Sequence, residues 1–401
     1  MPIRRKPCST AICGVVVLVV GCGVNVGSDR DDGTVPPLVA EETLRIGSVD
    51  DPETALTSIR ALEIASDGRI VTMHSRDRQI RVHAADGTPL VTFGGRGDGP
   101  GEFQTTTSMS IENDELRVWD SRNSRITRFD LDGTVLEVQT VRKQASDHPF
   151  LRTPHPQWAL SDGSVIGEYG LSQMNPGWEK ITETPIVRFG LDGEVLDTVA
   201  IHSFIGWSLI LDLSEMTTAP IPFAYNPLFR VSPARMEAVM VDRVVDAADP
   251  GITVTKLSVD GDTLWRRGYG YDPVAIDPAY VDSFVVGLTE QLVSIGFATA
   301  RRAEAAIRET MVIPDHAPAV DRVLIGHDGS TWLALADRDP ETTRWLVLDP
   351  NGDVHGRVTL PHDFRPLWAM VDVVWGMDRD ELDIPYIVRF DVRAASRADS
   401  P

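Results

Sequence analysis

The stretch LRVWDSRNSRITRFDLDGTVL, residues 116–136, decides the fold of this chain. Apolar and polar side chains alternate in it, first at Leu116 and Val118 and again from Ile126, and this period of two predicts half-buried β-strands. Its Asp132-Gly133 pair predicts a hairpin with a tight two-residue turn, because glycine adopts a positive φ freely and aspartate tolerates one. The stretch therefore contains three predicted strands and two turns.

The same pattern occurs 46 residues earlier. Ser75-Arg76-Asp77 precedes Asp86-Gly87-Thr88 just as Ser121-Arg122-Asn123 precedes Asp132-Gly133-Thr134. The chain is therefore predicted to be a repeat protein, in which each repeat is one small antiparallel sheet. Further turns of this kind are predicted downstream and upstream, at Asp67-Gly68, Asp162-Gly163, Asp192-Gly193, Asp260-Gly261, Asp328-Gly329 and Asn351-Gly352.

Strand patterns and turns divide the chain into six predicted blades. Five are complete, and the sixth ends near residue 392 with only three strands. A ring of blades has to cover the edge between its first and last sheets, and a strand from the opposite terminus commonly completes the last one. Residues 42–49, ETLRIGSV, form an isolated alternating strand that is placed to do so. We therefore predict an all-β fold over residues 41–395, a six-bladed β-propeller of four-stranded antiparallel blades.

One segment breaks the β pattern. Within residues 277–310, Val281, Val285, Leu288 and Leu292 follow helical spacing, which predicts a short helical insertion between blades four and five. The insertion either packs on the ring as a cap or offers a surface to a partner or a membrane.

A glycine-rich segment connects the first two predicted blades. Residues 97–103, GDGPGEF, resemble the G-x-G-P-G-x-F loop between the blades of NHL-type propellers. Together with the closing segment 374–388, this makes residues 42–392 similar to the six-bladed β-propeller family related to NHL repeats, which is found in many secreted bacterial proteins. The resemblance implies the fold rather than the function, because propellers serve as lyases, hydrolases, receptors and scaffolds.

The first 21 residues are predicted to be a processing signal. Arg4-Arg5-Lys6 precedes an apolar run, residues 11–20, that is too short to span a membrane as a helix. The sequence Val19-Val20-Gly21-Cys22 resembles a bacterial lipobox, and this implies a lipoprotein whose first mature residue is acylated Cys22. An ordinary cleaved secretory signal is the alternative.

The segments that flank the propeller are predicted to lack structure. Residues 22–40, rich in Gly, Asp and Pro, are expected to form a flexible tether, and residues 396–401 a disordered tail. With the lipobox, this organisation predicts an extracytoplasmic protein that is lipid-anchored to a bacterial membrane, at the outer membrane or on the periplasmic side.

Charge and cysteine content exclude some functions. The chain has 38 basic and 59 acidic residues, a net charge of −21, and such a surface repels nucleic acid. All three cysteines lie at or before Cys22, so the folded body has neither a disulfide nor a thiol nucleophile.

The long predicted connections share one face of the ring, because strands alternate in direction within each blade. Long loops on a rigid scaffold are where binding sites are usually built, so a small molecule or a protein is expected to bind on this long-loop face. Residues 202–211 are apolar enough for a lid or a partner contact, or else for burial against neighbouring loops. The long connections are residues 94–104, 140–156, 170–184, 200–226, 268–320 and 376–385.

The starts of the six innermost strands are expected to line the mouth of a central channel. Counting seven residues back from each inner turn gives one polar residue per blade, and such a ring of polar groups is a candidate small-ligand site. The six candidates are Arg60, Thr106, His155, Asn226, Asp321 and Arg365.

Two functions remain open from the sequence. The first is a binding or scaffold module without a cofactor. The second is a metal-dependent propeller enzyme of the lactonase or amidating-lyase type, in which ligands such as Glu63, His155 and Asp321 from separate blades would hold a divalent cation. The sequence contains no H-x-H, H-x-x-H or G-x-S-x-G motif, so we favour the binding module.

Overall fold

The computed structural model describes most of the chain between residues 35 and 396. The leader, Cys22, most of the predicted tether and much of the apolar segment 202–211 lie outside the described residues. The described residues are 35–48, 55–143, 148, 151–171, 181–203, 208–210, 218–220, 225–243, 251–296, 298–311, 313–336, 339 and 341–396.

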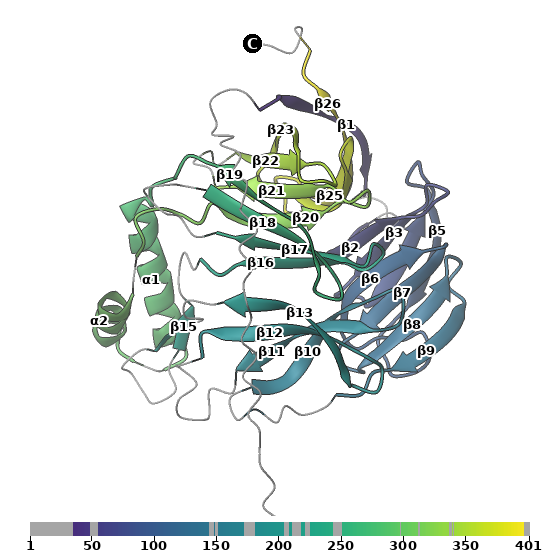
Figure 1. Cartoon of the computed structure of the whole chain (residues 1–401), viewed down its shortest axis with the longest axis horizontal. Coiled ribbons are helices and arrows are strands. Elements are labelled where there is room, and N and C mark those ends of the chain that lie inside the picture. The colour runs from purple at the N-terminus through teal and green to yellow at the C-terminus, as the bar shows by residue number, and fades with distance from the viewer. Residues whose placement is uncertain are drawn as a thin grey trace, which may run out of the picture.

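Six four-stranded antiparallel sheets form the molecule (Figure 1), as predicted. Blade one consists of β2 (Ile59–Ile64), β3 (Ile70–His74), β4 (Gln79–His83) and β5 (Pro89–Gly94). Blade two consists of β6 (Thr106–Glu112), β7 (Glu115–Asp120), β8 (Arg125–Asp130) and β9 (Val135–Thr140). Blade three consists of β10 (Leu151–Ala159), β11 (Val165–Leu171), β12 (Glu183–Phe189) and β13 (Val195–Ser203).

The second half of the chain forms the other three sheets. Blade four consists of β16 (Leu228–Ser232), β17 (Glu237–Asp242), β18 (Gly251–Ser258) and β19 (Thr263–Gly270). Blade five consists of β20 (Val320–Ile325), β21 (Thr331–Leu335), β22 (Thr342–Leu348) and β23 (Val354–Pro361). Blade six consists of β24 (Arg365–Met370), β25 (Val373–Arg379), β26 (Pro385–Ala394) and β1 (Leu38–Ile46).

The N-terminal strand closes the ring. β1 pairs antiparallel with β26, with Glu42 opposite Phe390 and Arg45 opposite Val388 (Figure 1), which confirms the predicted closure. The strand begins at Leu38, four residues before the predicted start, so the last residues assigned to the tether belong to the sheet.

Apolar clusters fill all six seams between neighbouring blades. In the seam between blades five and six, the rings of Trp332 and Trp345 lie 6.4 Å apart in an edge-on arrangement. Between blades six and one, Trp368 and Trp375 pack with Leu62. Because the last seam is packed like the others, burial of apolar surface stabilises the closed ring as a whole.

The Asp-Gly turns differ from the predicted two-residue turn. The N–H of Gly133 donates to the carbonyl of Asp130, and the N–H of Asp130 donates to the carbonyl of Thr134, which leaves three residues in the loop. Gly133 has φ +89, so the loop is a type I turn followed by a left-handed glycine. A Cβ at Gly133 would come within 2.6 Å of the Phe93 ring in the preceding blade, so this glycine also permits close packing between blades.

One arginine makes three hydrogen bonds to the backbone of the glycine-rich loop between blades one and two. The Arg125 guanidinium donates to the carbonyls of Asp98, Gly99 and Glu102, at 2.7, 2.8 and 2.5 Å. Phe103, at its end, is fully buried against Phe129. The loop is therefore a structural connection between blades.

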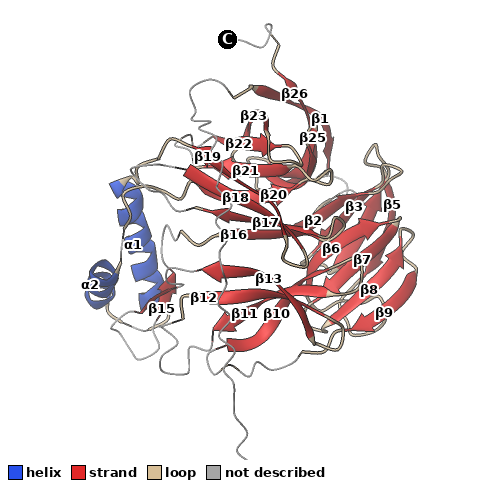
Figure 2. Ribbon diagram, viewed as in Figure 1, coloured by secondary structure: helices blue, strands red, loops and turns tan. Residues whose placement is uncertain are grey.

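The predicted helical insertion is present between β19 and β20. It consists of α1 (Pro278–Ser294) and α2 (Ala300–Thr310), which pack together through Val285, Leu288 and Ile307. α2 contacts β14 (Ser208–Ile210), which pairs with β15 (Thr218–Pro220), and both helices lie to one side of the propeller (Figure 2). In the described part of the chain, neither helix has the length and hydropathy needed to cross a bilayer.

Candidate functional site: the central channel

The first strands of all six blades surround a central cavity of about 320 Å³. Residues of β2, β6, β10, β16, β20 and β24 line it, and this volume is within the range of small-molecule sites. These are the innermost strands of the six blades, so every blade contributes to one shared cavity.

The two ends of the cavity differ. Arg322 and Arg365 also line an adjoining cavity of about 510 Å³, whose wall includes Asp339 and Asp363 from connections on the long-loop face. At the opposite end, Trp368 is shared with a cavity of about 580 Å³ formed by the short turns of the blades. The channel therefore runs from an arginine end on the long-loop face to a short-turn end.

Four arginines line the channel: Arg60 of β2, Arg230 of β16, Arg322 of β20 and Arg365 of β24. Among the described residues, none of their guanidinium groups has a carboxylate oxygen within 4.0 Å. Three of them donate to backbone carbonyls: Arg60 to Thr107 at 3.2 Å, Arg230 to Phe229 at 2.8 Å and Arg322 to Phe364 at 3.5 Å. We call these four side chains the channel arginines.

Burial and mutual repulsion act on the channel arginines together. Burial lowers the pKa of Arg365, and the charge of Arg60 lowers it further. Burial is also the main cause of the lowered pKa of Arg230 and of Arg322. The charge of Glu168 opposes this effect at Arg230 and that of Asp321 opposes it at Arg322, whereas the charge of Arg365 adds to it at both. Arg60, Arg230 and Arg365 are nevertheless exposed and Arg322 is half-buried, so these positive charges gather in an open channel that solvent can reach.

Local structure orients two of these residues. The Arg322 guanidinium lies over the Trp345 ring, 5.3 Å from its centre, in a cation–π contact that restricts its motion. Arg60 lies at an irregularity of β2, because Ile59 pairs with His74 while Ala61 pairs with Met73. Such a bulge turns a side chain out of the regular strand pattern.

Glu63 is the acidic group in the channel wall. It is half-buried, and burial raises its pKa to about 8. At neutral pH its carboxyl group is therefore mostly protonated, so it neutralises none of the channel arginines and can donate a hydrogen bond.

The six predicted channel-mouth residues do not all lie at the channel. Arg60 and Arg365 line the cavity, and Asp321 lines the adjoining cavity on the long-loop face. Burial raises the pKa of Asp321, and Arg243, Arg322 and His362 oppose this rise.

The other three predicted residues are not among those that line the channel. Thr106 is buried, and its hydroxyl has no hydrogen-bond partner among the described residues. His155 is exposed to solvent. The backbone carbonyl of Asn226 accepts a 2.7 Å hydrogen bond from Arg243, a contact that supports the loop before β16.

A three-residue sequence pattern that the sequence analysis did not include occurs in three of the strands that line the channel. Arg60-Ala-Leu62, Arg322-Val-Leu324 and Arg365-Pro-Leu367 repeat Arg-x-Leu in the inner strands of three adjacent blades, and all of these arginines and leucines line the channel. Arg230-Val-Ser232 follows the pattern in part. A search of the inner strands for shared basic positions would have found Arg322 and Arg230.

The residues considered for a metal do not come together. Glu63 lines the channel, Asp321 lines the adjoining cavity and His155 is exposed. Within the described ranges, no group of three or more His, Cys, Asp or Glu side chains is arranged to hold a metal ion.

Comparisons with known proteins agree with the architecture. The model of a family described as a 6-bladed beta-propeller, DUF5128, matches residues 51–161, and a comparison with curated protein sequences gave no match. A member of the DUF4221 family from Bacteroides vulgatus has a similar structure, with 10% identity and a TM-score of 0.51 over 89% of this chain and 98% of that chain.

Two further solved structures are similar at lower scores. One is a Bacteroides fragilis protein classed as exported, with 10% identity and a TM-score of 0.48 over 92% of this chain and 99% of that one. The other is virginiamycin B lyase from Staphylococcus aureus, with 12% identity and a TM-score of 0.39 over 88% and 99%. At these identities the likeness extends to the fold alone. The chain is thus a six-bladed β-propeller that is closed by its own N-terminal strand.

Proposed function

We propose that this protein is an extracytoplasmic binding module whose central channel takes a small anionic ligand. The observation that carries the proposal is the convergence of Arg60, Arg230, Arg322 and Arg365 on one cavity without a carboxylate partner among the described residues. A bound anion would supply the missing counter-charge.

The overall charge of the protein makes this arrangement unusual. The chain carries 59 acidic residues, enough to pair many of its basic groups, and arginines elsewhere have such partners. Guanidinium groups bind carboxylate and phosphate through two parallel hydrogen bonds, and these bonds are strongest where water is scarce. A cluster of guanidinium groups that solvent can reach, and that has no described carboxylate within 4.0 Å, is therefore suited to take an oxyanion from solution.

Calorimetric titration with inorganic phosphate and with citrate, in a buffer of low ionic strength, tests the proposal. We expect saturable binding to the wild-type protein and at least a tenfold loss of affinity in Arg365→Met, because one charge-assisted contact is worth about 1.5–3 kcal/mol. Arg188→Met, which removes an arginine outside the channel, is the matched control and keeps the wild-type affinity. Equal binding by the wild type and Arg365→Met would refute the channel as the site.

We further propose that lipid at Cys22 holds the module to a membrane. The basic leader, the short apolar run and the resemblance of residues 19–22 to a lipobox support this. Metabolic labelling with a palmitate analogue should mark the wild-type protein and not Cys22→Ser. Labelling of both proteins, or of neither, would contradict the anchor while leaving the channel proposal intact.

A further inference from the structure

Beyond the arginines, the channel wall has an apolar part, which lies beside polar residues such as Ser110 and Ser232. Trp158, Leu324 and Leu367 are half-buried lining residues, and we call them the apolar belt. The Trp158 ring is held edge-on against Phe229, with ring centres 5.8 Å apart. Behind the belt, Leu62 and Met109 are buried and also line the cavity.

The apolar belt lies deeper in the channel than the arginines. Leu324 follows Arg322 by two residues on β20, and Leu367 follows Arg365 by two residues on β24. Both strands run from the long-loop face towards the short turns, where Trp368 joins the next cavity. Two residues of a strand span about 7 Å. The backbone positions of the channel arginines and of the belt leucines are therefore separated along the channel by roughly the length of one aromatic ring; we call these two positions the charged level and the apolar level.

The geometry points to an amphipathic ligand for this channel, with a multiply charged oxyanion head at the channel arginines and an apolar body against the apolar belt. This inference rests on the proposed function and names the class of its ligand. Four guanidinium groups with no carboxylate partner in the described structure favour a head with two or more negative charges, as in a phosphate monoester or a dicarboxylate.

The size of the cavity limits the apolar body. About 320 Å³ has to hold both the head and the body, so the body is of the order of one aromatic ring or a short alkyl chain. In blades five and six the Arg-x-Leu repeat supplies both the arginine and the belt leucine from the same strand, so one rigid wall fixes the distance between head and body.

Two pairs of probes test the inference on the intact folded chain. Phenyl phosphate is compared with inorganic phosphate, and benzylmalonate with malonate, by calorimetric titration. In at least one pair, we expect the aromatic member to bind at least tenfold more tightly, because its ring leaves water for the apolar belt. The pair that binds more tightly identifies the head group as phosphate or dicarboxylate.

Substitutions in the apolar belt test separately how the charged head and the apolar body of a ligand contribute to binding. In Leu324→Ser and in Leu367→Ser, the advantage of the aromatic probe should fall several-fold while the affinity for the simple anion stays unchanged. Leu90→Ser, which changes an exposed leucine of β5 outside the channel, is the matched control. Melting curves show that each variant is folded, and the two separate belt positions allow the test even when one variant is unstable.

The outcomes distinguish this inference from the proposed function. Binding of the simple anions without any gain from the aromatic ring overturns the amphipathic ligand and leaves the anion site in place. A gain that both belt variants retain places the ring elsewhere and also overturns it. Failure of all four probes to bind the wild-type protein overturns the proposed function itself.

Discussion

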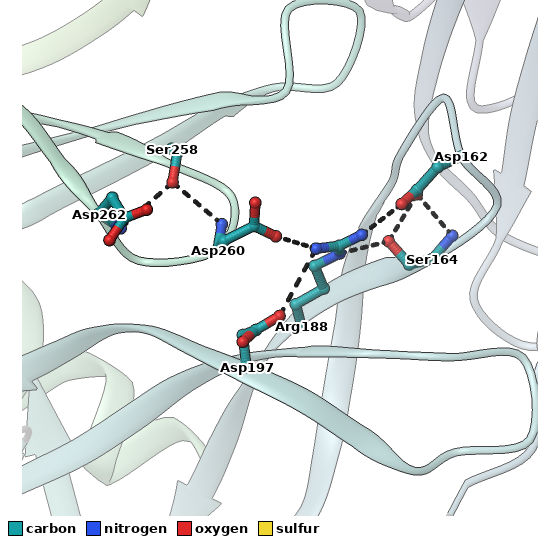
Figure 3. A network of polar contacts seen from close by, with 7 residues as sticks. All are labelled: Asp162, Ser164, Arg188, Asp197, Ser258, Asp260 and Asp262. Carbon is teal, nitrogen blue, oxygen red and sulfur yellow. Dashed lines mark hydrogen bonds and ion pairs between the residues drawn. The ribbon is translucent and has the colours of Figure 1, made fainter.

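The arginine at the seam between blades three and four and the arginines of the channel are in opposite environments. The Arg188 guanidinium contacts the carboxylates of Asp162 and Asp260, lies 3.6 Å from Asp197, and donates to the Ser164 hydroxyl at 2.8 Å (Figure 3). Asp260 belongs to the turn between β18 and β19, so this network joins two blades.

The channel arginines have no such carboxylates in the described structure. Carboxylates therefore contact the arginine that holds two blades together, whereas no described carboxylate comes within 4.0 Å of the arginines that face the central cavity. The difference indicates that the seam arginine joins blades, whereas the channel arginines are open to an anion from outside.

The largest expected effect concerns binding. In the double variant Arg322→Met and Arg365→Met, affinity for inorganic phosphate should fall by about 100-fold or more, since two charge-assisted contacts are lost. Calorimetric titration measures it, with Arg188→Met as the control of equal charge change at the seam. Retention of affinity by the double variant, or its loss in the control, would remove the distinction between the two regions.

Glu63 provides a second test, through pH. Its pKa of about 8 in the folded protein lies above its value of 4.5 in the unfolded chain, so the folded state holds an extra proton between these pH values. Glu63 therefore contributes a term that makes stability fall as pH rises from about 4.5 to 8 and then level off. Glu63→Gln should remove this term.

The measurement is the melting temperature of wild type and Glu63→Gln at pH 5, 7 and 9. The melting temperature of Glu63→Gln should rise relative to that of the wild type as pH increases through this range. The effects of other titrating groups cancel when the two melting temperatures are subtracted. A difference that is independent of pH would show that Glu63 is not a buried neutral acid.

A smaller effect is expected at the seam. Arg188→Met should lower the free energy of unfolding by about 1–2 kcal/mol, because it leaves Asp162 and Asp260 close together without their shared cation. The effect is small because these carboxylates are partly exposed to solvent. Denaturant unfolding checks it, and an unchanged midpoint would mean that the network contributes little.

The smallest effect should have the opposite sign. Arg365→Met, in a phosphate-free buffer of low ionic strength, should leave stability unchanged or raise it slightly, because the exposed Arg365 has no described carboxylate partner to lose and the substitution relieves repulsion with Arg60. The same unfolding experiment compares it with Arg188→Met. Destabilisation of both variants to the same extent would argue against an unpaired cluster.

The fold followed from the sequence because its signals are local. Alternating strands, Asp-Gly pairs and the missing fourth strand of the last blade were sufficient to predict the ring and its closure by residues near Arg45. Helical spacing at Val281 to Leu292 located α1 in the same way. The turn type was predicted wrongly, because two-residue and three-residue loops share the Asp-Gly pair.

The site was only partly predictable. Counting seven residues back from the inner turn found Arg60 and Arg365, because in these two blades the turn comes seven residues after an arginine that lines the channel. In blade five the count gave Asp321, yet its neighbour Arg322 lines the central channel. Both β2 and β20 have a bulge at the counted residue, and only in β2 does that residue line the channel, so the count alone does not decide which side chain faces it.

Blade four shows a second limit. Its inner turn has no Asp-Gly pair, and Met236 adopts the left-handed conformation with φ +55 instead. The count from Pro233 therefore ended at Asn226, before β16 begins, while Arg230 within the strand lines the channel. The lack of a described carboxylate within 4.0 Å of these arginines is a property of the assembled ring, which no single blade reveals.

Chemical modification of arginine tests the central claim most directly. Phenylglyoxal reacts with accessible arginine side chains that lack a carboxylate partner, and mass spectrometry locates each modified arginine. We predict modification of Arg60 and Arg365 in chloride, protection of both by inorganic phosphate, and little reaction at Arg188 in either solution. Modification of Arg365 that phosphate does not reduce would contradict an anion site in the channel.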